Sequence, residues 1–158
     1  FMFKILYEFH KLLTLIFTGK LIKFGNFSCL PKNHAEQLIN QPSLWNSYSS
    51  SVVKTIKDRT SIPSIRGVRY VLPSKMNFLA LIFHSLAIIS VFKNIVLIRS
   101  ILFFVIYLVF IFNDISLFSI LPIILLFIFV SIILKISTRA NMEEFDKSLD
   151  NIHSVDTL

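Results

Sequence analysis

Cysteine, glycine and charged residues are all scarce in this chain of 158 residues. Because Cys29 is the single cysteine, no disulfide can form within the chain and a zinc ribbon is excluded. We expect Cys29 to be a small buried apolar side chain. The chain has only three glycines and lacks a Gly-rich phosphate loop. Charged residues make up 16% of the chain, against about a quarter in soluble domains, which points to a membrane protein.

Two long apolar runs dominate the C-terminal half of a chain that is 54% hydrophobic. Residues 95–112 and residues 115–136 are each long enough for a helix that crosses a bilayer. No lysine or arginine separates the runs, whereas basic residues flank their other ends: Lys93, Arg99, Lys135 and Arg139. The positive-inside rule therefore predicts that residues 93–136 form a transmembrane hairpin. The protein would be multi-pass in the cytoplasmic (inner) membrane, with both termini cytoplasmic.

The N-terminal part alternates between helical and extended patterns. Residues 3–17 have an apolar stripe at helical spacing, and Gly19 follows where such a helix would end. We favour packing of this helix on a domain core, and the alternative is a helix in the membrane interface. The other elements expected here are short strands over residues 21–24 and 27–30 and helices over residues 32–40 and 44–56. Together they predict a compact, partial α/β segment within residues 1–75.

Residues 66–75, in the middle of the chain, are rich in groups that bind phosphate. Arg66, Arg69, Ser74 and Lys75 follow one another within ten residues, just ahead of an apolar helix. The planar guanidinium of arginine suits phosphate oxygens, and lysine adds a point charge. The same cations are also typical of a lipid-headgroup anchor beside a membrane. On composition alone the second interpretation is favoured.

Residues 76–92 form a third apolar run that is shorter and carries polar positions, among them Asn77 and His84. A helix that crossed the membrane here would put Lys93 and Arg99 on the outer side, against the charge rule. We therefore predict an amphipathic interface helix that leads into the hairpin, with His84 in a headgroup or packing contact. Arg99 is expected to reach the headgroups. Residues 137–158 are predicted to be a polar cytoplasmic tail.

Two motifs in these stretches resemble membrane-attached family-two glycosyltransferases of the dolichyl-phosphate-mannose-synthase-like and bactoprenol-glucosyltransferase-like kind. One is the run Arg69-Tyr70-Val71-Leu72-Pro73-Ser74-Lys75, followed by an interface helix and two spans. The family pattern there is R-x-x-G-x-S-K. The other is Gly25-Asn26-Phe27, which is similar to the family's G-[DN]-F segment. The resemblance extends from residue 1 to about residue 136 and corresponds to the C-terminal half of such an enzyme.

The resemblance implies both a fold and an activity. Residues 1–75 would be the C-terminal part of a GT-A catalytic domain, giving an α-rich membrane protein with a partial α/β part, an interface helix and a two-helix transmembrane hairpin. The activity would be transfer of a sugar from a nucleotide-sugar donor to polyprenyl phosphate or another membrane-associated acceptor. Arg69, Ser74 and Lys75, with Arg66 nearby, would bind the donor diphosphate, whose developing charge needs cations.

The resemblance also implies parts that the sequence lacks. The family's D-x-D motif, which holds Mg²⁺ or Mn²⁺ between the donor phosphates, is absent from these 158 residues. We therefore expect no cofactor in this chain, Mg²⁺ or Mn²⁺ in the complete enzyme, and a donor-binding half outside this chain. Leu72 replaces the glycine of the motif, and Asn26 stands where other members carry an aspartate that is a candidate base. Asparagine cannot abstract a proton, and an ionised phosphate acceptor has little need of a base.

A second hypothesis is a non-enzymatic small membrane protein. Its basic surface, part of a net charge of +7, would bind anionic lipid or a partner protein. We do not expect nucleic-acid binding, because the basic residues lie at the membrane boundary and no recognition motif occurs. Under either hypothesis the lipid bilayer is a partner, and the sequence is compatible with an oligomer.

Overall fold

The computed structural model describes residues 2–22, 27–63, 77–113, 115–143 and 147. Every regular element in these ranges is a helix. The elements are α1 (Met2–Thr18), α2 (Lys32–Ile39), the 3-10 helix η1 (Pro42–Trp45), α3 (Tyr48–Thr55), α4 (Phe78–Ser90), α5 (Lys93–Ile111) and α6 (Leu117–Ser137). The α-rich fold class is therefore confirmed.

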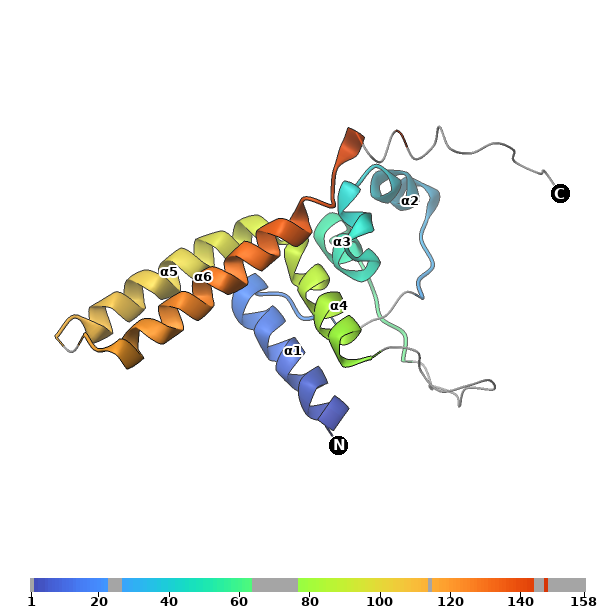
Figure 1. Cartoon of the computed structure of the whole chain (residues 1–158). Helices are drawn as coiled ribbons and strands as arrows, with labels where there is room; N and C mark the ends of the chain where they lie inside the picture. Colours follow the sequence, from blue (N-terminus) through green and yellow to red (C-terminus); the bar gives the residue numbers. More distant parts are fainter. Residues whose placement is uncertain (1, 23–26, 64–76, 114, 144–146, 148–158) are drawn as a thin grey trace.

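The helices form three groups (Figure 1). Helices α5 and α6 pack side by side into a long hairpin that projects from the rest of the molecule. Helices α1 and α4 pack against each other and against the end of the hairpin where α5 begins and α6 ends; we call this the inner end. Helices α2, η1 and α3 form a small cluster on α4.

The partial α/β part of the predicted fold is not supported. Residues 21–22 and 27–30, which cover the described parts of the two expected strands, are in neither a strand nor a helix. A strand needs a neighbouring strand to satisfy its backbone groups, and none is present in the described ranges. Ile22 instead packs against a buried cluster of Val53, Val91 and Phe92.

The helix expected over residues 44–56 is two helices. Ser47 has an extended backbone, with φ −162° and ψ 120°, and separates η1 from α3. Its side-chain oxygen accepts a hydrogen bond from the backbone N–H of Ser50 at 3.4 Å. This is the usual role of a serine at a helix N-cap, so Ser47 begins α3 instead of continuing the helix before it.

The predicted end of the first helix is confirmed. Gly19 follows α1 with φ +68°, and its N–H donates to the carbonyl oxygen of Leu15 at 2.8 Å. A left-handed glycine in this position is a common helix terminator. Pro31 stands at the N-cap of α2, directly before the helix that was predicted from residue 32.

The main core lies where α1, α4 and the hairpin meet. Ile89 of α4, Val96 of α5 and Ile133 of α6 are almost fully buried against one another. Leu13 and Phe17 of α1 pack against this cluster. A second, smaller core holds α2 and α3 together, with the buried residues Leu38, Val52 and Ile56. A separate buried cluster of Val53, Val91 and Phe92 joins α3 to the turn between α4 and α5.

Candidate functional site

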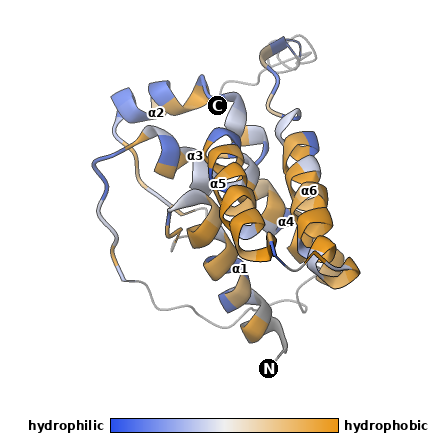
Figure 2. Ribbon diagram, turned by 90° about the vertical axis from the view of Figure 1, so that its left-hand side faces the viewer, coloured by the Kyte–Doolittle hydropathy of each residue, from blue (hydrophilic) through white to orange (hydrophobic). Residues whose placement is uncertain are grey.

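Most of the hairpin surface is apolar and exposed. Figure 2 shows α5 and α6 orange, that is hydrophobic, over most of their length. Toward the far end of the hairpin, Phe110, Leu117 and Phe118 are each more than 80% exposed. A soluble monomer rarely leaves such a large continuous apolar surface in water. Both helices are long and apolar enough to cross a membrane, which supports association of this chain with a membrane.

A hydrogen bond joins the two helices of the hairpin toward its far end. The hydroxyl of Tyr107 in α5 donates to the carbonyl oxygen of Ser119 in α6 at 3.0 Å. Ser116 and Ser119 cap the start of α6 through reciprocal hydrogen bonds. In a hydrocarbon environment an unpaired hydroxyl is costly, so the Tyr107 contact ties one helix to the other.

Exposed cations surround the inner end of the hairpin. Lys93 lies at the start of α5, Lys135 in the last turn of α6, and Arg139 just beyond it; all three are exposed. Lys20 follows α1 and is exposed as well. Cations in these positions can contact anionic headgroups while the apolar helices beyond them contact lipid tails.

Arg99 differs from these cations because its partners are within the protein. Its Nη1 donates to the carbonyl oxygens of Ile16 at 2.8 Å and Leu15 at 3.5 Å, in the last turn of α1. The carboxyl end of a helix attracts a cation, since its last carbonyls have no partner inside the helix. Arg99 therefore caps α1, a role that the sequence did not predict, and its expected contact with lipid headgroups stays a prediction.

Gly19 makes room for this cap. A Cβ atom built on Gly19 would lie 2.6 Å from Nη2 of Arg99. The positive φ of Gly19 is also strained for any residue with a Cβ. The glycine therefore ends α1 and admits the guanidinium at the same point.

His10 of α1 and His84 of α4 interact electrostatically. Burial, and then the charge of His84 in α4, lower the pKa of His10 in α1 below its usual value. Thr14 Oγ1 donates to the backbone oxygen of His10 at 2.8 Å and lies 3.4 Å from His10 Nδ1. His84, predicted to make a headgroup or packing contact, is exposed, and it acts on His10 by repulsion between two positive charges.

The histidine pair predicts that acid weakens the docking of α1 on α4. A lowered pKa in the docked state means that the undocked state binds more protons between the lowered pKa and the usual value of 6.5. Docking of α1 on α4 is therefore strongest above pH 6.5. It weakens as the pH falls from 6.5 through the lowered pKa of His10, because the undocked state then binds more protons. Hydrogen exchange of the α1 amides at about pH 7.5 and about pH 5.5 measures this. Corrected for intrinsic rates, exchange should be faster at the lower pH.

Two variants separate the effect of His10 from general acid sensitivity. His10→Gln should remove most of the difference between the two pH values, since glutamine does not titrate. His34→Gln, in the separate cluster on α2, should leave the difference unchanged. An equal pH dependence in His10→Gln and the unaltered protein would contradict the assignment.

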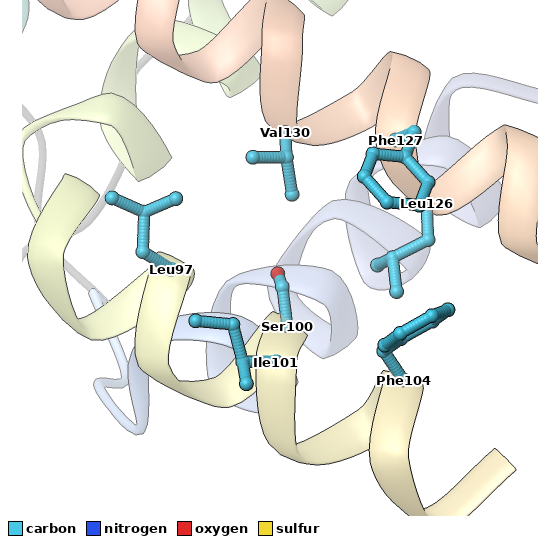
Figure 3. Close-up of a pocket in the computed structure, with 7 residues that line it drawn as sticks. All are labelled: Leu97, Ser100, Ile101, Phe104, Leu126, Phe127 and Val130. Carbon is cyan, nitrogen blue, oxygen red and sulfur yellow. The ribbon is translucent and has the colours of Figure 1, made fainter. Parts of the chain in front are cut away.

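A cavity of about 170 Å³ opens between α5 and α6 (Figure 3). It is lined by Leu97, Ser100, Ile101, Phe104, Leu126, Phe127 and Val130. The buried hydroxyl of Ser100 has no hydrogen-bond partner among the described residues. Apart from this hydroxyl the lining is apolar and carries no charged group, which does not suit a sugar or a phosphate.

The predicted site residues remain a prediction from the sequence. Asn26, Arg66, Arg69, Ser74 and Lys75 all lie outside the described residues. The described chain resumes at Asn77, two residues after Lys75, where the Asn77 side chain accepts the N–H of Ala80 at 2.8 Å and caps α4. Within the described ranges, no group of three or more His, Cys, Asp or Glu side chains could hold a metal ion. Cys29, expected to be buried, is exposed.

The contacts of Arg99 and His10 are the ones that sequence reasoning missed. Gly19 marked the end of α1, but no local signal named Arg99 as the cap. Comparisons with known proteins add no candidate, because no family model, no curated protein and no solved structure matches this chain.

Proposed function

We propose that this chain is the membrane-anchoring, acceptor-side part of a glycosyltransferase. The enzyme would move a sugar from a nucleotide-sugar donor to polyprenyl phosphate or another membrane-associated acceptor. The observation that supports this most is the position of α4. It begins three residues after the Arg69-to-Lys75 motif and packs at its other end on the inner end of an exposed apolar hairpin. In the sequence, the motif therefore directly precedes the helix that leads into the hairpin.

This arrangement suits a reaction between a soluble donor and a lipid-borne acceptor. The exposed cations of the inner end would lie at the membrane surface, where anionic groups gather. Arg69, Ser74 and Lys75 would contact the departing nucleoside diphosphate, whose negative charge increases as the bond to the sugar breaks. An ionised phosphate acceptor attacks without losing a proton, which is consistent with asparagine at position 26. The hairpin would be multi-pass in the inner membrane, with both termini on the cytoplasmic side.

The metal of such an enzyme does not fit this chain. The sequence holds no D-x-D, and the described residues contain no cluster of metal ligands. The donor phosphates and their Mg²⁺ or Mn²⁺ would therefore be bound by a nucleotide-binding half that is not in these residues. The role proposed for this chain is limited to cations, acceptor access and membrane attachment.

The proposal predicts that the motif cations are needed for transfer and dispensable for attachment. The assay uses membranes that contain this chain together with a nucleotide-binding half carrying a D-x-D, and it measures labelled sugar in the lipid extract. Arg69→Ala and Lys75→Ala should each lower transfer by about 100-fold, as loss of a transition-state contact does. The amount of chain in the membrane pellet should not change.

Lys57→Ala is the matched control, because it removes an exposed cation outside the motif and should leave transfer within about twofold. The second candidate function is a lipid-binding protein without enzymatic activity. The exposed cations Lys93, Lys135 and Arg139 support it. In that case Arg69→Ala, Lys75→Ala and Lys57→Ala would all weaken binding to anionic vesicles by similar steps, and no labelled lipid would form.

A further inference from the structure

Helix α1 has an apolar stripe that the described part of the protein leaves about half exposed. Ile5, Phe9, Leu12 and Ile16 follow one another at spacings of four, three and four residues, which places them on one face of the helix. Their exposed fractions are 53%, 55%, 52% and 38%. Four large apolar side chains in a row are more than the scattered exposed residues of an ordinary surface.

The other two faces of α1 make contacts of their own: one packs on the core and the other is polar. Leu13 and Phe17 pack on the main core. On the polar side, Lys11 forms an ion pair with Glu8 at 3.0 Å and lies 4.2 Å from the ring centre of Tyr7. The stripe is therefore distinct from the face that holds α1 to the protein. Packing on a core, the interpretation that the sequence favoured, accounts for only one of the two apolar faces.

The stripe continues the lipid-facing surface of the hairpin. The ring of Phe17 contacts Phe103 of α5, with ring centres 5.7 Å apart, and Phe129 of α6, with ring centres 4.4 Å apart. Arg99 holds the last turn of α1 at the same level. The carboxyl end of α1 thus lies beside the apolar helices, and the rest of α1 extends away from them at a steep angle (Figure 1).

We propose that α1 lies in the membrane interface, with Ile5, Phe9, Leu12 and Ile16 in contact with lipid acyl chains. Tyr7, Glu8 and Lys11 then face the headgroups and water, as the polar face of an interfacial helix does. The exposed apolar helices of the hairpin require lipid around them, and Phe17 contacts these helices. The stripe on α1 lies next to this contact, so lipid that surrounds the hairpin would cover the stripe as well. This surface is independent of the proposed glycosyltransferase activity.

Spin labels on single cysteines test the proposal in the full chain. Cys29→Ser removes the natural thiol, and Phe9→Cys, Leu12→Cys, Glu8→Cys and Leu13→Cys place labels on the three faces of α1. Each labelled protein is reconstituted into vesicles of phosphatidylcholine and phosphatidylglycerol. Collision rates are then measured with oxygen, which concentrates in lipid, and with a water-soluble nickel chelate.

The labels at positions 9 and 12 should collide more with oxygen than with nickel. The label at position 8 should show the reverse, and the label at position 13 should be shielded from both. High nickel collision at positions 9 and 12 would overturn the proposal, because the stripe would then face water. Shielding from both reagents there would overturn it as well, because protein, for example a second copy, would cover the stripe.

Tryptophan fluorescence tests the same orientation of α1 without a spin label. Phe9→Trp in a Trp45→Phe background leaves one tryptophan on the stripe, since Trp45 is the only other one. Bromine-labelled acyl chains should quench its fluorescence several-fold more than they quench a tryptophan at position 8 (Glu8→Trp in the same background). Equal quenching at the two positions would contradict the proposed orientation of α1.

Discussion

Replacing Ile133 with alanine is expected to lower the free energy of unfolding by about 2–5 kcal/mol. Ile133 is 1% exposed and joins α6 to α4 and α5 through Ile89 and Val96, with Phe17 of α1 beside them. Removing its side-chain carbons leaves a cavity at the point where four helices meet. Lipid tails are as apolar as the core, so the loss comes mainly from packing. An unfolding titration in mixed detergent micelles measures it.

Ile132→Ala is the matched control for this prediction. Ile132 is the neighbouring residue on α6 and loses the same atoms, but it is 37% exposed. Its substitution should change the free energy of unfolding by no more than about 0.5 kcal/mol. Equal losses in the two variants would show that the buried cluster does not hold the helices together.

Gly19→Ala is expected to release the carboxyl end of α1, at a cost of about 2 kcal/mol. Alanine strains the left-handed backbone at φ +68°. Its Cβ would also come within 2.6 Å of Nη2 of Arg99, so the guanidinium would have to shift from the carbonyl oxygen of Ile16. Both effects loosen the same turn, and hydrogen exchange of the last amides of α1 should accelerate.

A double-mutant cycle separates the two effects. In an Arg99→Ala background, Gly19→Ala should cost only its backbone strain, about 1 kcal/mol, because no guanidinium is left to displace. Arg139→Ala, which removes an exposed cation beyond α6, should leave the cost of Gly19→Ala unchanged. Full additivity of the Gly19 and Arg99 substitutions would rule out the contact between them.

The helices were predictable wherever their signals were local. The two apolar runs gave α5 and α6 within two residues at each end, because span length depends on hydrophobicity alone. Gly19 set the end of α1 for a local reason as well, since only a residue without a Cβ enters the left-handed region freely.

Other features depended on distant residues and were wrong or missed. Leu21 and Ile22 have a β-branched and apolar pattern, but a strand also needs an edge to pair with; Ile22 packs on the α3–α4 side instead. For Arg99 the sequence predicted contact with headgroups and did not indicate that its guanidinium caps α1, because the two residues involved are far apart in the chain. The candidate site itself rests on Arg69, Ser74 and Lys75, which lie outside the described residues, so it stays a prediction from the sequence.

The cap on α1 also has a consequence for the order in which the protein assembles. The guanidinium that satisfies the last carbonyls of α1 comes from a residue 83 positions later in the chain. During synthesis, α1 is therefore made long before the group that completes it. Contacts between such distant segments form late, because a long loop must close first. We expect the N-terminal helix to reach its final position only after the first helix of the hairpin has formed.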